Sequence, residues 1–377
     1  MSLPLSKTID VEDFASPELL PYLREINEQE AIRFGSTPDD IVPDSKQWEC
    51  AMALLALDRA GAASEGSLVA GIGAGTESTI FALARRNAFV FPVDRYLHRT
   101  VWSDVAPAGM LIDPAQYCLL EVPQGHVIPV NSSAMKLNLA SDTFDAVFSS
   151  GSIEHFGSLE HVALAAREIG RVLRPGGVAS IATEFRLDGP DDRRWFDDNV
   201  ILFTPQMLER YIVEASGLAL REPLVTDQSD KTFETRHNLV DFLKHAQTVH
   251  CLEEKRAVYP NLVLYHDGFL FCSVVLTLYK DRPLPALSPN QAEIARRVNV
   301  QVAEENAALA AGLEKYQRTA DSAEGAPHSH LLFGEVERLR AENDALRAAY
   351  DRANAWKHWP VMRPARFVYR RVKRWRG

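Results

Sequence analysis

The stretch "LVAGIGAGTES" (residues 68–78) is an apolar segment that runs into three glycines at alternate positions, Gly71, Gly73 and Gly75. Glycine permits tight or left-handed turns and lets another molecule contact the main chain. The next segment, 78–86, has the apolar spacing of a helix, so the turn would direct a helix N-terminus at a ligand. The pattern predicts a nucleotide-type site, although a glycine turn between strand and helix can also be purely structural.

Apolar strands and amphipathic helices alternate from residue 68 to about residue 185. The predicted strands are 67–73, 88–94, 144–151 and 176–183, and the predicted helices between them are 78–86 and 158–173. Such alternation indicates βαβ units and a parallel sheet that helices cover on both faces. A helix capped by Thr204-Pro205 and strands at 218–224 and 269–279 follow. The sequence therefore predicts an α/β fold with a doubly wound, mostly parallel sheet.

The composition excludes several classes of protein. The 377 residues are 46% hydrophobic and 24% charged, which is typical of a globular chain. The four cysteines lie far apart and form no CxxC or Cys/His cluster, so we expect no disulfide framework, no metal site and a reducing cytoplasmic location. The N-terminus lacks the pattern of a secretory signal, and no uninterrupted apolar stretch of about 18 residues exists to span a bilayer.

An acidic residue ends the second predicted strand. Asp94 lies about 20 residues beyond the glycine turn, at the carboxyl end of "AFVFPVD" (88–94). Ligands of doubly wound sheets bind outside these strand ends, and an acid there can accept hydrogen bonds from both ribose hydroxyls of a nucleoside. The alternative is that Asp94 only caps the following helix.

Three further motifs follow in order. They are FDAV at residues 144–147, the pair Glu154-His155, and LRPGG at residues 173–177. Together with the glycine turn and Asp94, they resemble the class I S-adenosylmethionine-dependent methyltransferases over residues 67–280. The resemblance implies a Rossmann-like, mostly parallel, seven-stranded sheet whose last strand, 269–279, is antiparallel.

The same resemblance implies S-adenosyl-L-methionine (SAM) as the cofactor. The cofactor-binding residues that it implies are Gly71, Gly73, Gly75, Glu77, Asp94, Ser132, Ser133 and Ser150. Two positions depart from the family pattern, because Gly71 stands where an acidic residue is frequent and Glu77 stands at the third glycine. The amino-acid end of SAM would thus be bound by Glu77 or by the backbone. An acidic residue near the adenine is replaced by residues 131–133, whose side chains could bond the adenine edge.

Methyl transfer requires an aligned acceptor, a site without water, and removal of a proton when the acceptor is a hydroxyl. Glu154 and His155 leave the predicted strand 144–151 where acceptor and methyl group would meet. His155 is the candidate base, because histidine titrates near neutrality, and Glu154 accompanies it. The alternative is that this pair only stabilises the loop or contacts the cofactor.

The composition changes along the chain and predicts five parts. They are an N-terminal helical cap (1–66), a methyltransferase domain (67–280), a linker (281–289), a helical extension (290–355) and a basic aromatic tail (356–377).

The extension and the tail have predicted partners of their own. Residues 331–355 carry an a/d seam with Asn343 at one a position, which favours a coiled-coil homodimer over a helix packed on the body. Residues 356–377 hold eight Lys or Arg, no acid and several aromatic residues, although the whole chain has a net charge of −10. Such a tail favours an anionic membrane surface over nucleic acid or a solvated terminus.

The glycine turn, the "SSGSIEHFG" segment and the basic extension together resemble methyltransferases of bacterial surface-polysaccharide biosynthesis. The resemblance implies methylation of a sugar hydroxyl in a surface glycan or its precursor, by a cytoplasmic enzyme peripheral to the inner face of the membrane. One alternative is a methyltransferase for a small-molecule metabolite. The other is a catalytically weak assembly protein that keeps the fold and acts through its coiled coil.

Overall fold

The computed structural model describes residues 2–98, 104–188, 200–246, 248–282, 284 and 287–323, with side chains as far as residue 312. Residues up to Ala295 form one compact unit, and residues 296–323 belong to a second. The predictions of a dimer through 331–355 and of membrane binding through 356–377 lie outside the described residues and stay predictions. Among the described helices, none is both long and apolar enough to cross a membrane.

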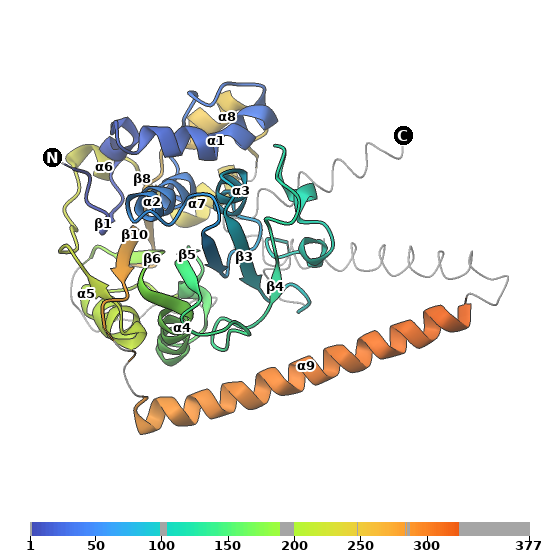
Figure 1. Cartoon of the computed structure of the whole chain (residues 1–377). Coiled ribbons are helices and arrows are strands. Elements are labelled where there is room, and N and C mark those ends of the chain that lie inside the picture. The colour runs from blue at the N-terminus through green and yellow to red at the C-terminus, as the bar shows by residue number, and fades with distance from the viewer. Residues whose placement is uncertain are drawn as a thin grey trace. The chain divides into compact units, whose positions relative to one another are not determined.

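A single mixed sheet forms the centre of the first unit (Figure 1). Its strands are β1 (Lys7–Thr8), β2 (Leu68–Ile72), β3 (Phe89–Asp94), β4 (Val130–Asn131), β5 (Phe144–Ser150), β6 (Leu173–Arg186), β7 (Ala219–Leu220), β8 (Arg236–Asn238), β9 (Val263–His266) and β10 (Phe269–Tyr279). The order along the sheet is β4-β3-β2-β5-β6-β10-β9-β8, with β1 and β7 also pairing with β10. The five strands β4-β3-β2-β5-β6 run parallel to one another, whereas β10 is antiparallel to β6. The predicted doubly wound fold and its antiparallel strand at 269–279 are confirmed.

The predicted number of seven strands is wrong, because the described residues contribute ten strands to the sheet. The additional pairings come from β1, which is two residues long, and from β8 and β9 beyond the parallel core. Strands this short carry no alternating pattern that a sequence could reveal.

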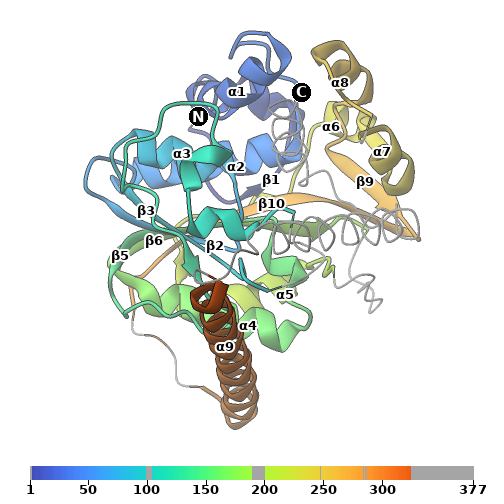
Figure 2. The same ribbon diagram turned by 90° about the vertical axis from the view of Figure 1, so that its right-hand side faces the viewer.

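Helices cover both faces of the sheet. They are α1 (Leu20–Phe34), α2 (Ser45–Arg59), α3 (Ser78–Arg85), α4 (Leu159–Val172) and α5 (Pro205–Leu208), which continues as the π-helical η6 (Glu209–Glu214). Figures 1 and 2 both show α2 and α3 above the sheet and α4 and α5 below it. Helix α2 is buried along most of its length, from Gln47 to Leu57, so the N-terminal cap is part of the core.

The segment between β7 and β10 contains three short helices. They are α6 (Asp230–Glu234), α7 (Leu239–Ala246) and α8 (Leu252–Val258). Helix α9 (Pro289–Ala323) begins in the first unit and continues into the second. It covers the described part of the predicted helical extension 290–355.

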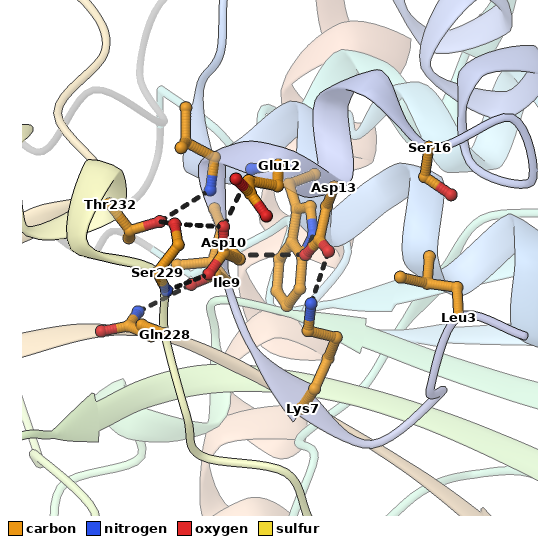
Figure 3. Close-up of polar contacts among 12 residues, drawn as sticks. Leu3, Lys7, Ile9, Asp10, Glu12, Asp13, Ser16, Gln228, Ser229 and Thr232 are labelled. Atoms are coloured by element: carbon orange, nitrogen blue, oxygen red, sulfur yellow. Dashed lines mark hydrogen bonds and ion pairs between the residues drawn. The ribbon is translucent and has the colours of Figure 1, made fainter. Parts of the chain in front are cut away.

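A polar network fixes the N-terminal segment to the rest of the unit (Figure 3). Asp10 accepts hydrogen bonds from the amide nitrogen of Ser229 at 2.5 Å and from its hydroxyl at 2.9 Å. Asp13 pairs with Lys7 and accepts a hydrogen bond from the indole of Trp48 at 2.8 Å. The Asp10 contacts hold the start of the chain against Ser229, and the Asp13 contact with Trp48 holds it against α2.

Candidate active site at the carboxyl ends of the parallel strands

The chain changes direction in the sheet between β2 and β5. From β2 it proceeds outward to β3 and β4, and then returns to add β5 and β6 on the other side. Such a switch point is where open α/β sheets bind ligands, outside the carboxyl ends of the strands. The glycine turn after β2, Asp94 at the end of β3 and Ser150 at the end of β5 all lie at this edge.

Two of the three glycines adopt conformations that favour glycine. Gly73 has φ +64°, and Gly75 has φ +47°. A Cβ at Gly75 would lie 2.4 Å from the carbonyl oxygen of Val105, so the turn is packed against a second backbone segment. The hydroxyl of buried Tyr96 donates to the Gly75 carbonyl at 2.9 Å and fixes the turn further. A rigid turn is thus built here, in which Gly73 is partly accessible and Gly75 is buried.

Gly71 has a packing role, and its predicted contact with the cofactor stays a prediction. It lies inside β2, and a Cβ at this position would be 2.5 Å from Cζ of Phe148 and 2.8 Å from Cβ of Ala74. The fully buried Phe148 ring therefore occupies the space of a side chain at position 71. Packing within the sheet accounts for this glycine, and ligand contact is not needed to explain it.

Asp94 connects the end of β3 to the glycine turn. One carboxylate oxygen accepts a hydrogen bond from the Gly75 amide at 3.0 Å, and the other accepts one from the Arg95 amide at 2.7 Å. Burial raises the pKa of Asp94, although both amide bonds lower it. The described residues 95–98 form no helix, so the capping alternative finds no support there. Each oxygen retains acceptor capacity for a ribose hydroxyl.

Residues 131–133 lie beside Asp94. The Ser132 amide donates to the Asp94 carbonyl at 3.0 Å, and its hydroxyl donates to the Lys136 carbonyl at 3.0 Å. Asn131 accepts a hydrogen bond from the Leu97 amide at 3.0 Å, while Ser133 is buried. The loop is therefore ordered by its own side chains, and Ser132 has acceptor capacity left but no free hydroxyl proton.

Glu77 precedes helix α3 but does not cap it. It occupies the N-cap position, yet its side chain accepts no hydrogen bond from the first turn, as an N-cap side chain ordinarily would. Its Oε2 is buried and has no hydrogen-bond partner among the described residues. Burial raises the pKa of Glu77 to about 8, with Lys46 opposing the increase and Glu49 adding to it.

Glu154 and His155 lie in η4 (Ile153–His155), directly after the loop that ends β5. Thr183 of β6 donates a hydrogen bond to Oε2 of Glu154 at 2.9 Å. Burial raises the pKa of Glu154 to about 7, helped by the nearby Glu49 and opposed by Lys46. The carboxyl group is thus held in one place and titrates near neutral pH, as a general base should.

His155 has the opposite titration behaviour. Its side chain is 12% exposed, and Nε2 lies 3.8 Å from Oε1 of Glu154. Burial and the positive charge of Lys46 lower the pKa of His155 to about 3. The imidazole is neutral at physiological pH and a weak base, so Glu154 is the better candidate for the proton acceptor.

Three charged side chains of this site carry no motif in the sequence. Lys46 and Glu49 lie on α2, and Glu184 lies on β6. Lys46 Nζ is 2.6 Å from Oε2 of Glu49, whose other oxygen accepts a hydrogen bond from Ser273 at 2.6 Å. Glu184 is 6% exposed, and burial followed by repulsion from Glu154 raises its pKa well above the usual value. The sequence signals only Glu184 among these three residues, because it is an acid within the apolar strand "VASIATEF" (178–185).

Groups of three or more potential metal ligands are absent from the part of the chain that the structure describes.

Comparisons with known proteins give the class of this site. Residues 70–181 match the family model described as "Methyltransferase domain", a span that runs from β2 to β6 and includes the glycine turn, Asp94 and Glu154. The search of curated proteins found no match.

Solved structures with similar folds include several methyltransferases. A putative sarcosine dimethylglycine methyltransferase from Galdieria sulphuraria is 13% identical, with 63% of this chain and 86% of that chain covered and a TM-score of 0.41. Geranyl diphosphate C-methyltransferase from Streptomyces coelicolor A3(2) is 13% identical, with 71% and 98% covered and a TM-score of 0.39. The [4+2]-cyclase SpnF is 18% identical, with 72% and 95% covered and a TM-score of 0.41.

The fold, the ligand edge and the matched domain define a class of protein. It is a SAM-dependent methyltransferase with a Rossmann-like sheet, and its cofactor is S-adenosyl-L-methionine.

Proposed function

We propose that this protein transfers a methyl group from SAM to a hydroxyl of a sugar in a bacterial surface glycan or its precursor. The observation that carries the proposal is the hydrogen-bonded carboxyl group of Glu154, with its pKa of about 7, just after β5, the strand that pairs with the one leading into the glycine turn. A hydroxyl acceptor has to lose a proton during methylation, and a carboxylate titrating near neutrality is suited to accept it. The sequence resemblance to enzymes of surface-polysaccharide biosynthesis supports the choice of a sugar.

The residues present fit the cofactor. Asp94 would accept hydrogen bonds from the ribose hydroxyls, and the Gly73–Gly75 backbone would lie along the methionyl chain. Glu77 supplies a buried carboxyl oxygen without a hydrogen-bond partner among the described residues. Its pKa is about 8 in the unliganded site, and the positive charge of the SAM ammonium group beside it would lower that pKa and favour the carboxylate. When bound, SAM supplies the methyl group.

The chain's own residues perform the remaining steps. Glu154, oriented by Thr183, would take the proton from the acceptor hydroxyl. Glu184 and Ser273 stand opposite each other on β6 and β10 and offer further polar groups to a sugar. Helix α2 covers this region and helps to exclude water from it, since its residues from Gln47 to Leu57 are buried.

A panel of acceptors tests the proposal. The protein is incubated with isotopically labelled SAM and with sugar nucleotides, lipid-linked glycans and small metabolites in parallel, and products are identified by mass. We expect the label on a sugar hydroxyl. Labelling of a small metabolite alone would refute the glycan assignment, and absence of SAM binding would support the catalytically weak assembly protein.

Replacing Asp94 by alanine is expected to weaken SAM binding by about 1.5–3 kcal/mol, the range for hydrogen bonds to a charged acceptor. The variant loses the ribose acceptor and also the bond that fixes the Gly75 amide. Calorimetric titration with SAM measures the change.

Asp145→Ala is the matched control for this prediction. Asp145 likewise anchors a backbone amide, that of Leu68 at 2.6 Å, but it does so at the opposite end of β2 and β5. Its replacement should leave the affinity for SAM unchanged. Equal affinities of wild type and Asp94→Ala would show that the ribose acid has been assigned to the wrong residue.

A further inference from the structure

The end of strand β2 has no room for an acidic side chain. A Cβ at position 71 would be 2.5 Å from the buried Phe148 ring, so even alanine requires the core to shift. The amino-acid end of the cofactor, which carries one ammonium and one carboxylate group, therefore needs charged partners from elsewhere in the chain.

Glu77 is placed to be one of these partners. It lies two residues beyond Gly75, and its carboxyl group makes no capping hydrogen bond to the helix that it precedes. Ser150, at the end of β5, faces it across the ligand edge. Burial dominates the raised pKa of Glu77, and the Ser150 hydroxyl is close enough to lower it.

Lys46 reaches the same place from helix α2. Its Nζ donates to the carbonyl oxygen of Ser150 at 2.7 Å and pairs with Glu49 at 2.6 Å. A lysine ammonium has three donors, so one remains for a ligand. Burial alone would lower the pKa of Lys46, but the carboxylates of Glu49 and Glu77 outweigh it and raise the pKa, so the side chain stays charged.

Ser150 lies near both side chains. Its carbonyl accepts the hydrogen bond from Lys46, and its buried hydroxyl, which has no hydrogen-bond partner among the described residues, is near enough to Glu77 to lower the pKa of that group. The side chain of Lys46 is 25% exposed, which leaves it accessible to a ligand. Lys46 also lies outside residues 70–181, the span that matches the methyltransferase domain.

We propose that Lys46 and Glu77 together recognise the zwitterionic end of SAM, Lys46 binding its carboxylate and Glu77 its ammonium group. This inference rests on the proposed function, and it assigns to the N-terminal cap a direct part in cofactor binding. The pair takes over the task for which position 71 has no space.

The test separates the two charges with three ligands. S-adenosylhomocysteine carries both charges, decarboxylated SAM lacks the carboxylate, and 5′-methylthioadenosine lacks the whole amino-acid end. Dissociation constants are measured by calorimetry for the full-length wild type and for Lys46→Gln and Glu77→Gln.

We expect Lys46→Gln to weaken binding of S-adenosylhomocysteine by about tenfold to a hundredfold, as for other charged hydrogen bonds, without affecting decarboxylated SAM. Glu77→Gln should weaken binding of both. Neither variant should change the affinity for 5′-methylthioadenosine. Lys231→Gln is the control, because Lys231 forms an exposed pair with Glu12 at 3.0 Å and should alter nothing.

Equal losses for all three ligands would show a merely structural role and overturn the inference, as would unchanged affinities in both variants. Lys46→Arg provides a check against misfolding, because it keeps the charge and should retain most of the affinity that Lys46→Gln loses. A wild-type protein that binds none of the ligands would instead refute the proposed function itself.

Discussion

Glu154→Gln is expected to lower the rate of methyl transfer by a factor on the order of 10²–10⁴, the usual contribution of a general base. The amide retains the size of the carboxyl group and can still accept the hydrogen bond from Thr183. It cannot take a proton, so catalysis should fall while the affinity for SAM is largely kept. Single-turnover transfer with labelled SAM measures the first quantity, and calorimetry measures the second.

The pH dependence provides a second readout of the same residue. Burial raises the pKa of Glu154 to about 7, so its carboxyl group loses its proton as the pH rises through this value. The base is the ionised form, and kcat/KM of the wild type should therefore rise with pH around neutrality. Glu154→Gln should lack this rise. A variant with the wild-type profile would show that another group titrates.

His155→Gln is the matched control for Glu154→Gln. The imidazole is already neutral near pH 7, because burial and Lys46 lower its pKa to about 3. Its replacement should leave the pH profile in place and affect the rate much less. If His155→Gln abolished transfer and Glu154→Gln did not, the base would be His155, as the sequence had suggested.

Glu49→Gln tests the origin of the raised pKa. Burial is its main cause in Glu154, and the negative charge of Glu49 adds to it. Removing that charge should move the rise in kcat/KM toward lower pH without removing it. A profile that did not move would show that Glu154 titrates independently of Glu49.

The parallel core of the fold could be predicted because each of its elements has a local signal. Strand β2 ends in a glycine turn, and helix α4 has clear amphipathic spacing between Ser158 and Leu173. The strands β1 and β8 are two and three residues long and exist only through pairing with other strands. Tertiary contacts form them, so no local pattern could have given the strand number.

The candidate site likewise contains some residues that the sequence predicts and others that it does not. Asp94 and Glu154 lie at the ends of predicted strands, where the topology itself places ligands. Lys46 and Glu49 reach the site because α2 packs over β5 and β6, and nothing in the sequence of α2 specifies that packing.

The packing role of Gly71 could not be predicted from the sequence either, because it depends on the Phe148 ring of the neighbouring strand. Burial also makes Glu154 rather than His155 the base in our proposal, since their pKa values depend on surroundings that only the fold creates.

Gly73→Ala is expected to reduce the affinity for SAM on the order of a hundredfold, because the new methyl group has no space. Its Cβ would lie 2.6 Å from Oγ of Ser152 and 2.8 Å from Cβ of the same residue. Ser152 cannot turn aside freely, because its hydroxyl bonds the Ile72 carbonyl at 3.1 Å and the Ser149 hydroxyl at 2.8 Å. The glycine turn and the loop after β5 would be pushed apart, and both contact the cofactor in the proposed site.

Gly61→Ala separates this collision from backbone strain. Gly61 has φ +68°, nearly the same as the +64° of Gly73, but a Cβ there meets no atom within 4 Å. Both variants incur the cost of a left-handed backbone, about 1–2 kcal/mol, and should lose similar stability from that source. Only Gly73→Ala should lose affinity for SAM, as measured by calorimetry on protein whose circular dichroism shows a folded state. Normal binding by folded Gly73→Ala would mean that the cofactor does not pass between the turn and the loop after β5.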